Sequence, residues 1–467
     1  MVSSRNEELM TALINGEDVK DYIPRSRNEQ FLKDCAVGSE TTTLEPRSRS
    51  EMLLSEVHNK IKSGGGLDID LKSVFDKTKS AECFFCGHIN SYYNIFYYIK
   101  DLSNLIKYED TSNVTNMFEM FKYCENLIIA PQMDTSNATS MGYMFSYCKS
   151  LTTVPQMNTS KVTSMGGMFS GCSSLINVPQ IIDTSNVTYI GAMFEGCSSL
   201  ITVPQMNTSK ATNMHYMFSG CKKLETVPQM NTSNVTNMEF MFERCSSLIN
   251  VPQMDTRNVT SMLNMFSGCK NLETAPQMDT SKVDVMSQMF YFCSRLATVP
   301  QMNTSNVTSM GNMFYGCKNL ETAPQMDTSK VTNMYCMFCE CSNLITVPQM
   351  NIINVTDTGG MLSGCSKLEY INLLNIKVNI YIGSGNEWGH LIQKECLIQI
   401  ISELIKPESG TRTLTMGTAN TAKLADTYVK LLEDDGSGKY PFELCESTVE
   451  GAMTITDYCL YKNWQLA

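Results

Sequence analysis

The chain has 467 residues, with 36 Lys and Arg against 47 Asp and Glu, and a formal net charge of −11. That balance argues against a nucleic-acid partner, because non-specific binding to phosphates needs a basic surface. No apolar run approaches 18 residues, and the first residues lack the apolar stretch of a secretory signal, so we expect neither membrane insertion nor such a signal.

Residues 1–62 carry one short motif three times, at intervals of 22 residues. Each copy reads Ser-x-x-Glu before an apolar pair, and the copies begin at Ser4, Ser26 and Ser48. This capping box predicts three short helices. Helices this short are marginal alone, so we expect them to attach and oligomerise the chain; the alternative is a flexible tail. The residues expected to serve attachment are Arg5, Glu7, Arg27, Glu29, Arg49 and Glu51.

Residues 63–104 are expected to form a linker and an N-terminal cap. Three glycines follow Ser63, which is typical of a hinge, and residues 95–99 are strand-like. Cys83, Cys86 and His88 have the spacing of half a zinc site. A closed zinc site needs four ligands, so packing within an aromatic-rich cap is favoured over metal binding.

Residues 105–370 repeat one 24-residue phrase, of which residues 141–164 are a clear copy. One cysteine marks each copy, and the interval is 24 except between Cys172 and Cys197, where one residue is inserted. A fixed short period predicts a solenoid of about eleven coils, each stacked on the last. The marker cysteines are Cys124, Cys148, Cys172, Cys197, Cys221, Cys245, Cys269, Cys293, Cys317, Cys341 and Cys365.

The uniform positions of each coil are apolar. Met and Phe stand four and three residues before the cysteine, Leu stands three residues after it, and Val or Ala follows. Stacked in register, these positions predict ladders of like side chains that fill the interior, with Phe121 to Phe338 in one ladder and Leu362 closing it. The cysteines are interpreted as buried small hydrophobic residues, because a disulfide scaffold would be short and irregularly spaced.

The polar half of each coil predicts its path. Val-Pro-Gln-Met indicates a short strand, with the Pro at a strand end or a bulge because it offers no N–H group. The following Asn/Asp-Thr-Ser is turn chemistry, in which the Asx side chain accepts a bond from a backbone N–H group. The Val-Thr-x-Met-x-x-Met-Phe stretch is the return arm, and its apolar spacing of three and four predicts a helical or 3₁₀ turn.

Residues 371–467 read as a mixed cap of helices and strands. Lys394–Leu404 predicts an amphipathic helix, Arg412–Gly417 a strand, and Ala419–Leu432 a second helix. Trp464 is expected to pack near the end of the chain.

Catalytic constellations are not evident in the sequence. It has no phosphate-binding Gly loop, and its four histidines are scattered, so we expect no enzyme activity and no cofactor. Cys336, Cys339 and Cys341 form the densest cysteine cluster. A metal clip there would need a fourth converging ligand, so reduced packing is favoured.

The variable positions indicate where recognition would occur. In the return arm, aromatic and histidine residues differ from copy to copy, and such side chains beside amides and hydroxyls suit sugar or protein recognition. The alternative is that they are ordinary solvent-facing substitutions. The residues expected to bind a partner are Tyr143, Tyr189, His215, Tyr216, Phe240, Tyr291, Tyr315 and Tyr335.

The repeat resembles the BspA-like leucine-rich repeat, on the residues Val-Thr-x-Met-x-x-Met-Phe-x-x-Cys-x-x-Leu followed by Asn/Asp-Thr-Ser-Asn-Val-Thr. The fold class implied is a leucine-rich-repeat-like solenoid with short parallel strands and helical or 3₁₀ return arms. The N-terminal Ser-Arg-x-Glu segments are similar to the attachment segments of phage tail-fibre and minor structural proteins. The C-terminal residues 391–404, 412–424 and 462–467 are similar to the closing segment of such proteins.

This resemblance implies a phage or prophage-derived tail-fibre-like protein of the virion. Its N-terminal helices would bind other virion proteins, and its repeat surface would bind a glycan or protein receptor of the bacterial envelope; a homo-oligomer is expected. The alternatives are an adhesin at the bacterial cell surface and a passive virion decoration protein, because the residues alone support only a binding solenoid with an attachment tail.

Overall fold

The computed structural model describes residues 112, 114–130, 132–179, 183–383, 391–433 and 435–466. Several predictions lie outside these residues and stay predictions: the three N-terminal helices, the linker and cap of residues 63–104, and the strand-like residues 95–99. The residues of those predictions are Arg5, Glu7, Arg27, Glu29, Arg49, Glu51, Cys83, Cys86 and His88.

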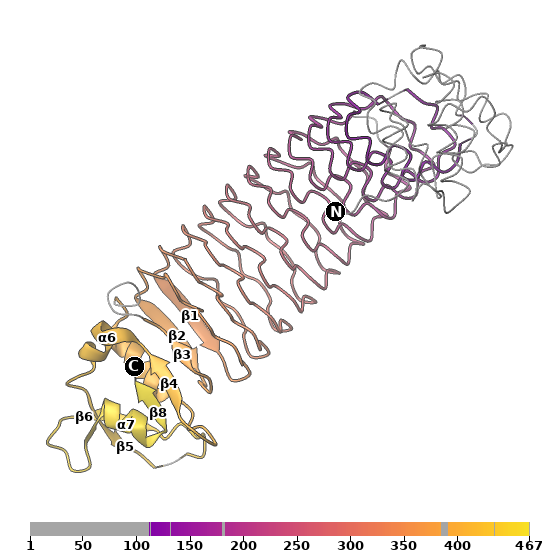
Figure 1. Ribbon diagram of the computed structural model, residues 1–467. Helices are drawn as coiled ribbons and strands as arrows, with labels where there is room; N and C mark the ends of the chain where they lie inside the picture. The colour runs from indigo at the N-terminus through magenta and orange to yellow at the C-terminus, as the bar shows by residue number, and fades with distance from the viewer. Residues whose placement is uncertain are drawn as a thin grey trace, which may run out of the picture. The chain divides into compact units, whose positions relative to one another are not determined.

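The chain forms two compact units. The N-terminal unit extends to Ala211 and includes Tyr216–Lys223; the C-terminal unit comprises Thr212–His215 and Leu224–Ala467. Within each unit the chain winds in stacked coils, and in the C-terminal unit the coils are followed by a cap of helices and strands (Figure 1). None of the described helices is long and apolar enough to cross a bilayer.

The phenylalanine ladder predicted from the repeat is present in both units. Its rings are fully buried, and neighbouring rings stack with centroids 5.4 to 5.8 Å apart and planes within 9° of parallel. That distance lies within the favourable range for aromatic pairs. Because each coil contributes one Phe at the same position, the stacking of the coils sets the distance between neighbouring rings in the core.

The marker cysteines form a second buried ladder, as predicted. They are free thiols, and the thiol of one coil donates a hydrogen bond to the backbone carbonyl of the preceding coil's ladder Phe, over 3.0 to 3.2 Å. Burial raises the pKa of eight of these thiols, for example to about 12 at Cys341. They stay protonated and act as small core residues.

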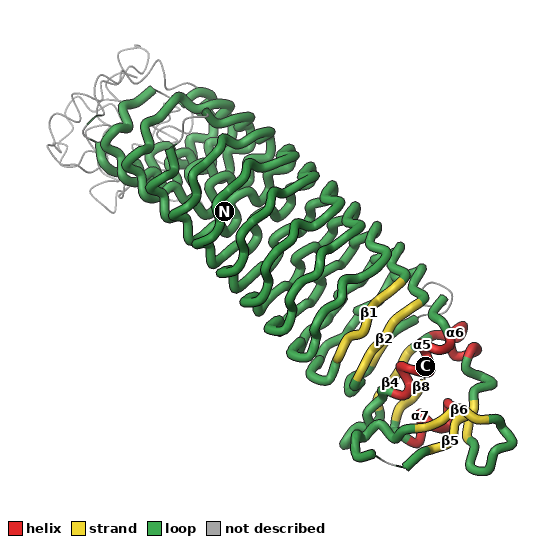
Figure 2. Tube along the Cα trace, turned by 180° about the vertical axis from the view of Figure 1, so that it is seen from behind, coloured by secondary structure: helices red, strands yellow, loops and turns green. Residues whose placement is uncertain are grey.

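The return arms contain single turns closed by i→i−3 hydrogen bonds, as in the predicted 3₁₀ turn, but no continuous helix, which corrects the helical alternative. Two N–H groups in the coil of Cys293 show how the arm is bonded. The Met289 N–H donates to the carbonyl of Met286 in its own coil, whereas the Phe292 N–H donates to the carbonyl of Tyr315 in the next coil. Successive N–H groups alternate between these two kinds of partner along residues 288–293. Gln288 and Phe292 adopt positive φ angles of 57° and 56°, which no helix allows. Turns and bridges replace the helix in the described coils (Figure 2).

Within the described coils, few residues form β-strands. Strands β1 (Thr346–Asn351) and β2 (Tyr370–Leu374) pair in parallel, and their register shifts between Val347 and Met350. Pro348 lies inside this shift, so the predicted bulge is confirmed there. Elsewhere in the described coils, single parallel bridges such as Thr226 with Asn250 mark the same position.

Polar side chains tie neighbouring coils together. The buried Thr of each Asx-Thr-Ser segment donates through Oγ1 to the Asx backbone carbonyl of the next coil, over 2.8 to 2.9 Å. The Asx turn is also confirmed, since the N–H of Ser281 donates to Oδ1 of Asp279 over 3.0 Å. The segment therefore closes the turn and fixes the register of the stack.

The cap contains two three-stranded sheets, ordered β3-β4-β8 and β6-β5-β7. The first is parallel and the second antiparallel. The elements are β3 (Ile380–Tyr381), α5 (Lys394–Ser402), β4 (Arg412–Thr415), α6 (Gly417–Lys423), β5 (Tyr428–Leu431), β6 (Phe442–Cys445), β7 (Met453–Thr454), α7 (Ile455–Tyr461) and β8 (Trp464–Leu466).

The cap confirms two sequence predictions and corrects one. Helix α5 and strand β4 lie where they were expected. The helix predicted over Ala419–Leu432 ends at Lys423, because Tyr428–Leu431 pairs with β6 and β7 instead.

Two buried polar side chains close the end of the cap. Trp464 is fully buried, as expected, and its indole N–H donates to the Ile405 carbonyl over 2.9 Å. Lys462 is also fully buried, and its ammonium donates to the Tyr458 hydroxyl over 2.8 Å. Burial lowers the pKa of Lys462 to about 7.

Candidate binding surfaces

The aromatic residues predicted to bind a partner lie along the return arms. Tyr335 is exposed, and the other seven are half-buried. Within the C-terminal unit, Tyr291 and Tyr315 come together with ring centroids 5.0 Å apart. Phe292, which the sequence reasoning missed, lies 4.7 Å and 5.1 Å from these two rings. We call Tyr291, Phe292 and Tyr315 the C-terminal aromatic patch.

A second aromatic group lies in the N-terminal unit. Tyr143 meets Phe118 edge to face, with centroids 5.8 Å apart, and Tyr123 stacks on Tyr147 at 5.1 Å. The Lys122 ammonium lies 5.4 Å and 5.3 Å from the rings of Tyr123 and Tyr143, a cation–π distance. These four rings, of which only Tyr143 was predicted, are the N-terminal aromatic patch.

Glycines of the next coil lie directly beneath several of these rings. A Cβ atom at Gly171 would lie 2.7 Å from the Tyr147 ring, and one at Gly316 would lie 2.9 Å from the Phe292 ring. Each ring and its glycine occupy the same position of adjacent coils, one residue before the cysteine. The signal in the sequence is therefore an aromatic residue followed 24 residues later by glycine.

The histidine and three other predicted aromatics lie at further points along the return arms. His215 bonds Oδ1 of Asn213 in its own coil through its backbone N–H at 3.0 Å and its ring Nδ1 at 2.6 Å. Tyr216 and Phe240 adopt positive φ angles, as Tyr143 does at the same repeat position. Tyr189 lies over Gly166 in the neighbouring coil, and burial raises its pKa.

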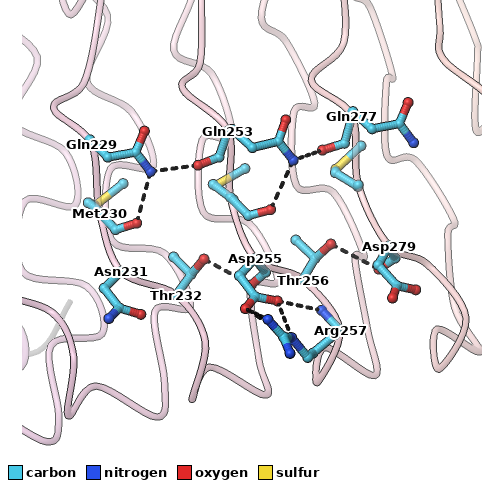
Figure 3. Close-up of a pocket in the computed structure, with 12 residues that line it drawn as sticks. Gln229, Met230, Asn231, Thr232, Gln253, Asp255, Thr256, Arg257, Gln277 and Asp279 are labelled. Atoms are coloured by element: carbon cyan, nitrogen blue, oxygen red, sulfur yellow. Dashed lines mark hydrogen bonds and ion pairs between the residues drawn. The ribbon is translucent and has the colours of Figure 1, made fainter.

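A polar groove of about 710 Å³ crosses three coils of the C-terminal unit (Figure 3). Its wall is a ladder of amides: Gln229 donates through Nε2 to the Gln253 carbonyl over 2.7 Å, and Gln253 to the Gln277 carbonyl over 2.8 Å. The groove is lined by Gln229, Met230, Asn231, Thr232, Gln253, Met254, Asp255, Thr256, Arg257, Gln277, Met278 and Asp279.

Arg257 is the feature of this groove that the sequence reasoning did not single out. It stands where the coils from Ser136 to Ser329 otherwise have serine. Its guanidinium donates two hydrogen bonds to the Asp255 carboxylate, from Nη2 to Oδ2 over 2.6 Å and from Nε to Oδ1 over 2.9 Å. These hydrogen bonds hold the pKa of Asp255 below its usual value. Arg257 is exposed and Asp255 is half-buried, so the cation is the more accessible charge of the pair.

The cysteine cluster does not form a metal site. Cys341 belongs to the core ladder, Cys339 is buried and Cys336 is half-buried. Within the part of the chain that the structure describes, no group of three His, Cys, Asp or Glu side chains is placed to hold a metal ion. Burial raises the pKa of Cys339 to about 11, so its thiol remains protonated.

Comparisons with solved structures point to leucine-rich repeat proteins. A T. pallidum leucine-rich repeat protein is 21% identical, with 41% of this chain and 76% of that chain covered and a TM-score of 0.26. A leucine-rich repeat protein from Eubacterium ventriosum is 17% identical, with 60% and 85% covered and a TM-score of 0.35. Among curated proteins, none matches the chain in sequence.

Comparison with family models gives a repeated match. The family described as "Mycoplasma protein of unknown function, DUF285" matches residues 69–179, 124–228, 176–278 and 274–375. Because these segments together run from residue 69 to residue 375, more than half of the chain, the chain belongs to the DUF285 family.

Proposed function

We propose that the chain is a non-enzymatic binding protein of the adhesin type, whose aromatic patches bind a glycan or protein of the bacterial envelope. The observation that supports this proposal is that exposed aromatic rings pack directly on glycine residues of the next coil. Tyr147 and Phe292 are 41% and 38% exposed although each packs on a glycine. The glycine supports one side of each ring. Tyr147 is also covered by the Tyr123 ring that stacks on it, so each ring offers its exposed part, rather than a whole face, to a partner.

Anchored rings are efficient binding groups. A ring already held in place loses little conformational freedom when a partner stacks on it, so more of the contact energy appears as affinity. Phe118 is 36% exposed, and the Lys122 ammonium, which forms an ion pair with Glu119, lies over the rings of Tyr123 and Tyr143. Aromatic and cationic side chains together are typical of the strongest contacts in interfaces.

The state of the thiols supports a role without catalysis. A cysteine is nucleophilic as the thiolate, and burial raises the pKa of Cys148, Cys172 and Cys197 far above neutrality. These cysteines therefore serve the core. We propose no cofactor.

A narrower form of the proposal is the phage tail fibre. It depends on the flanking segments, residues 1–62 and the C-terminal motifs, which would attach the chain to other virion proteins as a homo-oligomer. The T. pallidum and Eubacterium ventriosum proteins are described only as leucine-rich repeat proteins. The broader proposal, adhesin-type binding at a bacterial or virion surface, needs only the coils.

The repeat itself supplies well-matched variants for the test. The position before the cysteine holds an aromatic residue in three coils, at Tyr123, Tyr147 and Phe292, and Arg244 in another. Six further coils have glycine there with positive φ, so a glycine substitution keeps the backbone geometry. The six are Gly171, Gly196, Gly220, Gly268, Gly316 and Gly364.

The measurement is co-sedimentation of the full chain with purified bacterial envelopes. We expect the triple variant Tyr123→Gly, Tyr147→Gly, Phe292→Gly to bind at least about tenfold more weakly, as for the loss of interface anchors, and Arg244→Gly to bind like the unchanged chain. Protease treatment of the envelopes distinguishes a protein receptor from a glycan. Equal binding by the triple variant and the unchanged chain would refute the proposal.

A further inference from the structure

A hollow of about 600 Å³ lies in the C-terminal unit where the last coils meet the cap. Four cationic side chains from separate segments line it: Lys377 before β3, Lys406 after α5, Arg412 at the start of β4, and Lys439 before β6. Its volume is in the range of small-molecule sites. It is remote in sequence from both aromatic patches.

The charge of this hollow is opposite to that of its surroundings. Residues 371–467 contain eight Lys and Arg against twelve Asp and Glu, so half of the cap's cations line one hollow. Glu408 is the single carboxylate among the lining residues. Cations gathered in a concave, partly desolvated place raise the local concentration of anions.

Two of the four cations already have partners. Lys439 forms an ion pair with Glu403 at 2.5 Å, and the Lys406 ammonium lies 5.1 Å and 5.4 Å from the rings of Tyr440 and Tyr461. Lys377 and Arg412 are exposed and form no ion pair with any described residue. The Lys377 ammonium is a compact charge and the Arg412 guanidinium is a planar group with several N–H donors, so both can bind an oxyanion.

Arg412 also lines a second hollow of about 480 Å³, together with Asn379, Tyr381 and Thr413. This second hollow contains one carboxylate, that of Asp357, and its other polar lining groups apart from Arg412 are neutral. Hydroxyls, an amide and an aromatic ring that is 38% exposed suit the hydroxyl-bearing body of a ligand. Arg412 would thus stand at the junction between an anionic group and the organic residue that carries it.

We propose that this pair of hollows binds a sugar phosphate, with the phosphate held by Lys377 and Arg412 and the sugar lying beside Thr413 and Tyr381. Arginine matches the phosphate group with two parallel N–H bonds, and lysine adds charge without fixed geometry. The site is separate from the aromatic patches, so it can exist whether or not the patches bind an envelope.

The test is calorimetric titration of the full chain with glucose 1-phosphate, and separately with inorganic phosphate. We expect the double variant Lys377→Gln, Arg412→Gln to bind glucose 1-phosphate at least about tenfold more weakly, as for two charged hydrogen bonds. The control Lys367→Gln, Lys430→Gln removes the same charge from residues that do not line either hollow, and should leave affinity unchanged. Arg412→Lys should give an intermediate loss.

Three outcomes would overturn the proposal. The full chain could fail to bind glucose 1-phosphate, or the control variant could lose as much affinity as the double variant, which would indicate non-specific attraction. Equal affinity for inorganic phosphate and glucose 1-phosphate would show that the second hollow holds no sugar. Because Lys377 and Arg412 are exposed, the variants should keep the unfolding midpoint of the unchanged chain, and that midpoint is measured alongside.

Discussion

Replacing Phe290 by alanine tests the central feature of the solenoid, the stacked ring ladder. Phe290 is fully buried and lies 5.7 Å, centroid to centroid, from both Phe266 and Phe314. The substitution leaves a cavity between two coils and removes two stacking contacts at once. Because each coil contacts only its neighbours, the damage should be concentrated at these two interfaces.

The magnitude follows from the burial. Truncating a fully buried Phe typically costs about 3–5 kcal/mol, which includes the lost transfer energy and the cavity. Each stacked aromatic pair is worth about 0.5–1.5 kcal/mol beyond its area. We therefore expect Phe290→Ala to lie in the upper half of the range for Phe truncation.

The control is two residues away. Phe292 is 38% exposed, so Phe292→Ala removes the same atoms from the surface and should cost about 1 kcal/mol or less, like other surface changes. Urea unfolding of both variants gives the difference in free energy. Hydrogen exchange at the Phe290 N–H, which donates to the Met313 carbonyl, shows whether the loss is local. A cost for Phe290→Ala no greater than for Phe292→Ala would refute the buried ladder.

Three further predictions concern pH, the glycines and the N-terminal segment. Burial raises the pKa of eight ladder thiols above the ordinary value of 9.0, so the contribution of these thiols to stability should be constant below about pH 9 and fall above it, by about 1.4 kcal/mol per pH unit for each thiol that stays protonated only when folded. The lowered pKa of Lys462 acts in the opposite direction between about pH 7 and 10.5, but it is one group against eight. Urea midpoints that do not decline between pH 9 and pH 10.5 would contradict this prediction. Gly167 has a φ of +62° and lies beneath the Tyr143 ring, so the substitution Gly167→Ala should lower the free energy of unfolding by at least about 1–2 kcal/mol. The control is Gly311→Ala, at a glycine without positive φ, which should lower it by less in the same thermal unfolding series. Deleting residues 1–62 should reduce the mass in solution to that of a monomer, measured by light scattering; an unchanged mass would remove the attachment role of that segment.

The sequence alone determined the architecture of the coils. A strict 24-residue period places the same side chains at the same depth in every coil, so the ladders of Phe and Cys could be predicted from spacing. The bulge at Pro348 and the turn at Asp279 were predictable for a similar reason, because each depends on the chemistry of one or two adjacent residues.

The tertiary structure decided what depends on a neighbouring coil or a distant segment. The return arm at Gln288 has helical apolar spacing, but half of its N–H groups find better-placed carbonyls in the next coil, and positive φ angles follow. The patch at Phe292 requires glycine one coil later, a pairing that no single coil reveals. Lys377, Arg412 and Lys439 lie far apart along the chain, and only the packing of the cap brings their charges to one hollow.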